Sequence, residues 1–225
     1  MRGLDALLGY YGEEGGCDEG PSYWNIAAGT VFDSLELYHW ASDGEIDLYG
    51  ETKIQNMGRH IYRVHIADDY FCAFSDCKGK TEVDPALLYR YGQRIGDEHL
   101  WKLGLYAGQR RDDAGWVFSS KPNRLLPAVF VYEEMTKHVS VEPPLLGHTW
   151  IGDIQVMTAR EQEGSQKGLF LGCKAGHNGE SHNHNDVGNY IVYLDGSPVI
   201  IDVGAADYIR KTFSPKRYEI WTMQS

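Results

Sequence analysis

Two histidines separated by a single residue lie in the most polar stretch of the sequence. Residues 176–186 read GHNGESHNHND and hold three histidines, three asparagines, one glutamate and one aspartate. Residues i and i+2 of an extended backbone point the same way, so His182 and His184 can face one side of a site. Imidazole nitrogens suit proton transfer near neutral pH and metal binding. The alternative is a polar loop in which these side chains cap turns.

A carboxylate is expected beside the two histidines. In NYIVYLDGSPVIIDVG, Asp195 and Gly196 separate two β-branched and aromatic runs, a strong signal for a β-hairpin. A hairpin brings its ends together, so Asp202 should lie near the entry of the outgoing strand, close to His184. Two imidazoles and one carboxylate would supply most of a tetrahedral zinc site. A zinc-protease helix needs histidines four residues apart, and a cupin-type site needs a glutamate within the residues that follow the histidines, so neither pattern fits.

The sequence pattern predicts helices in the first half of the chain and strands in the second half. Apolar residues recur every three or four positions over 21–41, and further helices are expected over 54–67, from Asp84 to Gly96, and after Asp97. Residues 113–144 are expected to form a connector. The segments TWIGDIQVMTAR, GLFLGCKAG and the hairpin then indicate antiparallel strands, so the sequence predicts an α+β chain with a boundary near 140–148.

Composition and charge limit the class of protein. The 225 residues are 42% apolar and 12% aromatic, enough for a globular chain with a substantial core. The formal charge of −11 argues against a nucleic-acid binder and against a protein resting on an anionic membrane. No apolar run approaches the roughly 20 residues of a spanning helix. The four cysteines lack zinc-knuckle spacing and are expected to be free thiols.

Several longer segments resemble one enzyme family. The run GHNGESHNHNDVGNYIVYLDGSPVIIDVG resembles the β-domain signature of the heparinase II/III-like polysaccharide lyases, and CDEGPSYWNIAAGTVFDSLELY resembles the stretch that carries their catalytic tyrosine. WIGDIQVMTAR and KTFSPKRYEIWTMQS are similar to strands of the same family. The resemblance implies part of an (α/α) toroid over residues 1–145, incomplete at its N-terminus. It also implies a truncated antiparallel β-sandwich over residues 146–225, incomplete at its C-terminus.

The resemblance also implies an activity and site residues. Such enzymes are carbon–oxygen lyases that cleave an anionic, uronic-acid-containing polysaccharide by β-elimination, in the periplasm or after secretion. Tyr23 matches the family's proton-transfer tyrosine and His182 its catalytic histidine. His184 and Asp202 match two ligands of a structural zinc ion that would fix the loop bearing His182. His177 and Glu180 are polar neighbours and candidate substrate contacts.

Two expected groups have no counterpart in the sequence. The family's carboxylate-neutralising asparagine or histidine precedes the tyrosine, but residues 1–16 contain neither type. The third zinc ligand is expected beyond Ser225. We interpret the chain as an internal fragment of a longer enzyme; taken alone, it is expected to bind zinc weakly, to form an open half-sandwich and to have little lyase activity. The alternatives are a catalytically incomplete carbohydrate-binding or scaffold protein of the same fold, and a cupin-like oxygenase with redox iron. Sequence alone leaves the oligomeric state undetermined.

Overall fold

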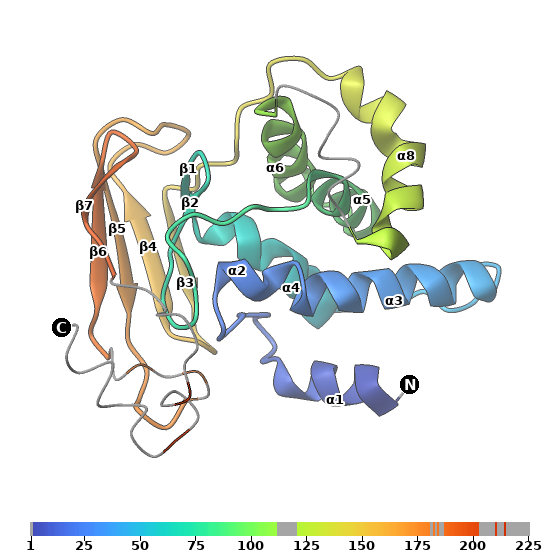
Figure 1. The fold of residues 1–225 in the computed structure, drawn as a ribbon, viewed down its shortest axis with the longest axis horizontal. Coiled ribbons are helices and arrows are strands. Elements are labelled where there is room, and N and C mark those ends of the chain that lie inside the picture. Colours follow the sequence, from blue (N-terminus) through green and yellow to red (C-terminus); the bar gives the residue numbers. More distant parts are fainter. Residues whose placement is uncertain are drawn as a thin grey trace.

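The computed structural model describes residues 2–111, 121–180, 182, 184, 187–202, 210 and 214. The chain is α+β, with a group of helices beside a five-stranded antiparallel sheet (Figure 1). The helices are α1 Arg2–Tyr10, α2 Pro21–Trp24, α3 Ala27–Ala41, α4 Thr52–Arg63, α5 Pro85–Ile95, α6 Glu98–Gln109 and α8 Pro122–Thr136. The strands are β1 His65–Ala67, β2 Tyr70–Phe71, β3 His148–Ile151, β4 Val156–Arg160, β5 Leu169–Lys174, β6 Tyr190–Leu194 and β7 Ser197–Ile200.

The helical hairpin of α5 and α6 follows its local sequence signals. The side chain of Asp84 accepts a hydrogen bond from Leu87 N at 3.0 Å, and that of Asp97 accepts one from Leu100 N at 3.0 Å. These are N-caps, which satisfy backbone donors that have no partner within the helix. Gly96 ends α5 in the left-handed conformation, with φ of 66°. The predicted start of both helices and the break between them are confirmed.

Two predicted helices are interrupted in the structure. The helix expected over 21–41 divides into α2 and α3 at Asn25 and Ile26, whose backbones keep right-handed helical angles. The side chain of Asn25 pairs with another loop: its Nδ2 donates to Glu82 O at 2.8 Å and its Oδ1 accepts from Asp84 N at 3.3 Å. The helix expected over 54–67 ends at Arg63, because the following residues form β1 and pair with β2. At the end of α4, pairing between β1 and β2 replaces the helical pattern.

Two helices were not expected. The predicted connector over 113–144 contains α8, and residues 2–10 form α1. Pro122 lies in the first turn of α8, where the N–H that proline lacks would have no partner within the helix. The strand expected over 211–225 lies outside the described residues.

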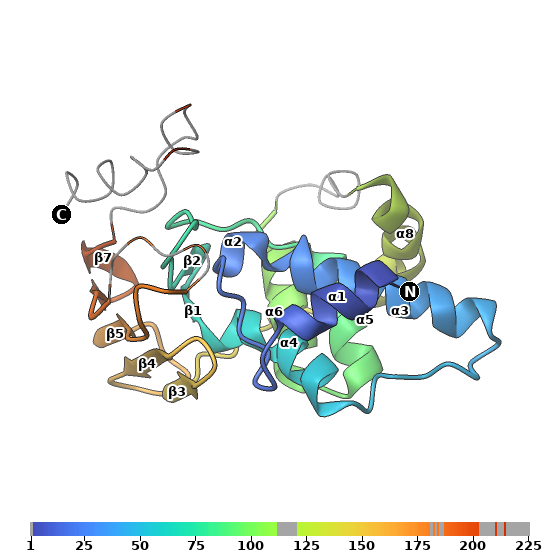
Figure 2. The same ribbon diagram turned by 90° about the horizontal axis from the view of Figure 1, so that it is seen from below.

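The large sheet is a simple meander. Its strands run in the order β3-β4-β5-β6-β7, each antiparallel to the next along the chain (Figure 1). Figure 2 shows β3, β4, β5 and β7 in the same order from below. Asp195 and Gly196 join β6 to β7 with φ of 50° and 75°, the two positive values that a type I′ turn requires. The predicted hairpin is therefore confirmed.

One face of the sheet packs on the helices. Ile151, Phe170 and Ile191 of this inner face belong to the same buried cluster as Trp24 and Phe32 of the helical layer. Burial of apolar surface stabilises a fold by roughly 25 cal/mol per Å². The helices and the sheet therefore share a hydrophobic core.

The opposite face of the sheet is also apolar. Trp150 pairs with Met157, Met157 with Cys173, and Cys173 with Tyr190, so these side chains form a row across four strands. Trp150 is 52% exposed and Tyr190 49% exposed. We call this surface the outer face. Across the described part of the chain, no helix combines the length and apolarity needed to cross a bilayer.

Candidate functional site

The turn that carries Tyr23 is fixed by its neighbours. Gly20 precedes α2 with φ of 90°, and Tyr23 N donates to Gly20 O at 3.1 Å. Trp24 is fully buried, and its Nε1 donates to Met57 O at 2.7 Å. Tyr23 is half-buried and packs against the main core. Trp24 therefore anchors the turn and leaves Tyr23 at its surface.

His182 and His184 meet on one buried carboxylate. His182 Nδ1 lies 2.7 Å from Asp76 Oδ2, and His184 Nε2 lies 2.8 Å from Asp76 Oδ1. The side chain of Asp76 is only 2% exposed. His182 has φ of 56°, a left-handed conformation that is uncommon for residues other than glycine and is often found at functional sites. The structure thus brings both predicted histidines to the same partner.

Glu19 joins this pair to the tyrosine turn. Its Oε1 lies 2.9 Å from His182 Nε2. Glu19 directly precedes Gly20 and lies four positions before Tyr23. The segments that carry Tyr23 and His182 come from opposite ends of the chain and are in contact. The two predicted catalytic residues therefore belong to one region of the molecule.

The two carboxyl groups differ in their electrostatic surroundings. Burial alone would raise the pKa of Asp76, but hydrogen bonds from His184 and His182 outweigh it and hold that pKa below its usual value. Burial raises the pKa of Glu19, opposed by the nearby His182 ring. Asp76 is thus the stronger acid of the two and the stable anion between the rings.

The predicted zinc ligands have protein partners. His184 contacts Asp76, and the side-chain amide of Asn189 donates to Asp202 Oδ2. Asn189 immediately precedes β6, so Asp202 lies at the entry of the outgoing strand, where the hairpin predicted it. Imidazole and carboxylate are suitable zinc donors. Within the described residues, however, no three histidine, cysteine, aspartate or glutamate side chains are grouped to hold a metal ion. The described chain supplies at most part of a zinc site, and the ligand roles stay a prediction.

Glu180 holds the turn that leads into the histidines. Lys174 Nζ donates to Glu180 Oε2 at 2.6 Å, and the side chain of Lys174 is buried. The backbone N of His177 donates to Glu180 Oε1 at 3.3 Å, and Gly179 N donates to His177 Nδ1 at 3.2 Å. This internal role is visible in the structure, while substrate contact by His177 and Glu180 stays a prediction.

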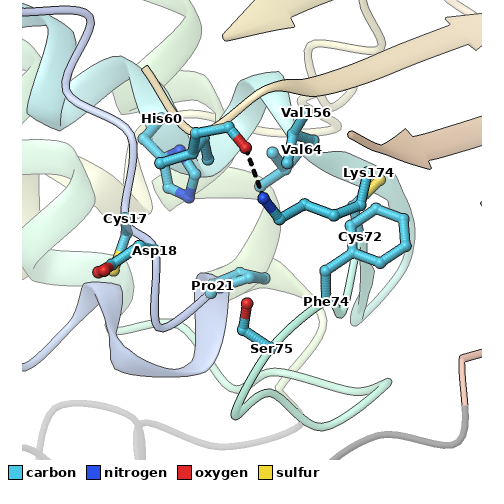
Figure 3. A pocket seen from close by; sticks show the side chains of 12 residues that line it. Cys17, Asp18, Pro21, His60, Val64, Cys72, Phe74, Ser75, Val156 and Lys174 are labelled. Atoms are coloured by element: carbon cyan, nitrogen blue, oxygen red, sulfur yellow. Dashed lines mark hydrogen bonds between the residues drawn. The ribbon is translucent and has the colours of Figure 1, made fainter. Parts of the chain in front are cut away.

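A small cavity lies between the tyrosine turn and the sheet (Figure 3). Its volume of about 20 Å³ has room for about one water molecule and is too small for a sugar ring. Lys174 reaches into this region from β5, and its Nζ donates to Ile154 O at 2.9 Å. The cavity is lined by Cys17, Asp18, Gly20, Pro21, His60, Val64, Cys72, Phe74, Ser75, Ile154, Val156 and Lys174. This cavity is therefore not a candidate sugar site.

The sequence patterns did not point to Asp76 or Glu19 as site residues. Asp76 lies in YFCAFSDC, a largely apolar and aromatic stretch. A carboxylate in such a stretch is a candidate for burial, and buried charges are almost always paired. That signal predicts a partner for Asp76 but does not say which residue it is.

Comparison of the sequence with protein-family models and with curated proteins finds no match to either.

Proposed function

We propose that this chain carries part of the active site of a polysaccharide lyase that cleaves a uronic-acid-containing polysaccharide by β-elimination. The observation that supports the proposal is the contact between Glu19 and His182. It joins the turn bearing Tyr23 to the loop bearing His182, as a two-residue proton-transfer site requires. The sequence resemblance supplies the reaction class.

The reaction needs one proton acceptor and one proton donor. A base removes the proton at C5 of the uronate, the electron pair forms the C4–C5 double bond, and the bond from C4 to the glycosidic oxygen breaks. The leaving oxygen takes up a proton. Tyrosine has a reference pKa of about 10, so Tyr23 needs nearby positive charge or hydrogen bonds to act as a base. Once ionised it removes the C5 proton or returns one to the leaving oxygen, and His182 performs the complementary step.

The finer fold assignment is part of the proposal. Sandwich proteins pack two sheets face to face about 10 Å apart. The outer face is apolar along the row from Trp150 to Tyr190, which supports a second sheet lying over it. We propose likewise that the helices are part of a toroid.

Zinc, if bound by His184 and Asp202, would hold the loop that carries His182. It has no place in the proton transfers, and metal analysis of the purified protein tests whether it is present. A zinc-free protein that keeps the Asp76 contacts would remove zinc from the proposal.

The first prediction concerns turnover. Uronate polysaccharides are incubated with the full-length protein that carries this chain, and the ultraviolet absorbance of the unsaturated product is followed. We expect Tyr23→Phe and His182→Ala to lower kcat by roughly 10²-fold or more, because each removes one proton-transfer group. Tyr38→Phe is the matched control, because Tyr38 lies about three turns from the start of α3 and so away from the turn that carries Tyr23. Wild-type turnover in Tyr23→Phe, or no product from any uronate polymer, would contradict the lyase proposal.

A non-catalytic carbohydrate-binding protein is the second candidate. It is favoured by one observation: both ring nitrogens of His182 contact carboxylates, Nδ1 that of Asp76 and Nε2 that of Glu19. In this arrangement neither nitrogen is available to a sugar until Glu19 moves. Calorimetric binding of a uronate oligosaccharide without product formation would support this second function over the first.

A further inference from the structure

We propose that residues 75–78, here called the clamp loop, are the positioning element that sets the Tyr23 turn against His182. Asp76 is the positioning residue on the histidine side, and Cys77 is its counterpart on the tyrosine side. The catalytic consequence of this inference rests on the proposed lyase function. The structural consequence, the orientation of the His182 ring, does not.

Asp76 fixes two rings with one carboxylate. Each of its oxygens contacts a different histidine, at 2.7 Å to His182 Nδ1 and 2.8 Å to His184 Nε2. Because the carboxylate is 2% exposed, water competes little for these hydrogen bonds. With Nδ1 held, the opposite nitrogen of His182 must point away from the clamp loop. That nitrogen, Nε2, lies 2.9 Å from Glu19, next to the tyrosine turn.

The next two residues of the clamp loop hold the tyrosine turn itself. Cys77 Sγ lies 2.9 Å from Ser22 Oγ and accepts from Ser22 N at 3.3 Å. Lys78 N donates to Ser22 Oγ at 3.2 Å. Ser22 immediately precedes Tyr23. Successive residues of one short loop therefore contact the tyrosine turn and the histidine pair.

The clamp loop is itself closed at its base. Tyr70 of β2 forms an antiparallel bridge with Lys80, and Thr81 N donates to Asp69 O at 2.9 Å. Within the loop, Ser75 adopts a left-handed conformation with φ of 63°. That conformation is costly for a residue with a side chain and persists where surrounding contacts enforce it. A loop fixed at its base can transmit its own geometry to both partners.

The second prediction tests Asp76 by kinetics. Asparagine carries an NH2 donor in place of one carboxylate oxygen, so in Asp76→Asn one of the two rings loses the acceptor that it contacts. We expect kcat to fall by roughly 10- to 100-fold with KM changed only a few-fold, because the ring is misoriented while sugar contacts remain. Asp97→Asn is the matched control: Asp97 is also a buried carboxylate and accepts from Arg59, Tyr62 and Leu100 N, but it caps α6. Equal kcat in Asp76→Asn and wild type would overturn a positioning role in catalysis.

A second readout does not depend on turnover. Nitrogen-15 NMR of the imidazole rings follows the Nδ1 proton of His182, which Asp76 should protect from exchange. We expect Asp76→Asn to shift the His182 ring signals and speed that exchange, and Asp97→Asn to leave both unchanged. If His182 signals are the same in wild type and Asp76→Asn, the clamp is wrong even where lyase activity is present. If no polymer is turned over but the signals change as expected, the lyase proposal fails and the clamp stands.

Cys77→Ala keeps the inference testable if Asp76→Asn does not fold. This substitution removes the sulfur contact with Ser22 but leaves Asp76 and its two histidines in place. We expect a several-fold fall in kcat with unchanged His182 ring signals, because the tyrosine turn moves while the ring does not. Unchanged kcat in an active, folded Cys77→Ala protein would overturn the tyrosine side of the clamp.

Discussion

Gly20 lets the chain approach the clamp loop closely just before Tyr23. Its φ of 90° and ψ of 175° lie in a region that residues with a side chain rarely adopt. A Cβ at this position would stand 2.7 Å from Phe74 O and 2.8 Å from Cys77 Cβ. This position requires a residue that tolerates the unusual backbone angles and has no side chain. Both requirements explain why residue 20 is a glycine.

The third prediction follows from this geometry. Gly20→Ala should lower the free energy of unfolding by roughly 2–4 kcal/mol, from a disfavoured backbone conformation plus overpacking. Gly96→Ala is the control, because Gly96 also has positive φ but no atom within 4 Å of the added Cβ. Gly96→Ala should lower the free energy of unfolding by about 1–2 kcal/mol, the cost of the left-handed conformation alone. Chemical denaturation measures the free energy of unfolding of both variants. An equal loss of stability in the two would show that Phe74 and Cys77 leave room for a side chain at position 20.

Candidate site residues stood out where the sequence carries a local motif, and their roles stay a prediction. Tyr23, His182 and His184 stood out because they lie in recognisable segments, and the structure brings those segments together. Asp76 was not predictable as their partner, because its contacts with residues 182 and 184 span more than a hundred positions. Nothing in a short sequence window reports such a contact.

The junction of β4 with β1 connects the sheet to the helical layer. Arg160 of β4 donates from Nη2 to His65 O at 3.0 Å and Ile66 O at 3.2 Å, and from Nε to Leu146 O at 2.8 Å. Its guanidinium lies 5.1 Å from the centre of the Phe170 ring. The Arg160 side chain thus donates hydrogen bonds to carbonyl groups of two segments that are far apart in the sequence, β1 and the segment that precedes β3.

The fourth prediction concerns this junction. Arg160→Lys should lower the free energy of unfolding by roughly 2–3 kcal/mol, because an ammonium group cannot reach the same set of carbonyl oxygens and leaves buried acceptors without donors. Arg110→Lys is the control: Arg110 pairs with Asp68 at the surface, and such a pair contributes about 0–1 kcal/mol. Thermal denaturation followed by circular dichroism measures both. A loss at Arg160 no larger than at Arg110 would mean that the junction carries little stability.

Elements with capping or turn signals matched the sequence, whereas the end of α4 and helix α8 did not. Contacts within a few residues set the starts of α5 and α6, through the caps Asp84 and Asp97. The turn at Asp195 and Gly196 likewise sets the hairpin of β6 and β7. The end of α4 was not predictable, because β1 forms only through its pairing with β2. α8 was hidden by prolines that suggested a connector, although one of them starts the helix.

At the scale of the whole molecule, the shared core contains neutral histidines. His60 and His65 are buried, and burial lowers the pKa of His60 to about 3 and that of His65 to about 4. Each ring therefore takes up a proton more readily in the unfolded chain, near pH 6.5, than in the folded one. The two neutral rings give their full stabilising effect above about pH 6.5. The effect is lost as the pH falls to about 4 for His65 and to about 3 for His60.

The fifth prediction is that acid destabilises the folded protein at pH values at which most carboxylates are still ionised. From pH 7 to pH 5 the free energy of unfolding should fall by roughly 2 kcal/mol for each of these histidines. In His60→Gln the dependence of the free energy of unfolding on pH should weaken by the contribution of one histidine. His148→Gln, at an exposed position of β3, is the matched control. Urea denaturation at several pH values measures the slope. An identical slope in His60→Gln and wild type would show that His60 is not buried in its neutral form.

The distribution of the four thiols makes the outer face directly observable. Cys17, Cys72 and Cys77 are buried, and burial raises the pKa of each thiol, so they react slowly with alkylating reagents. Cys173 is half-buried and lies between Met157 and Tyr190 in the row of outer-face side chains. A maleimide dye added to the native protein should therefore attach mainly at Cys173. Its fluorescence would then report whatever covers that face, without any engineered cysteine.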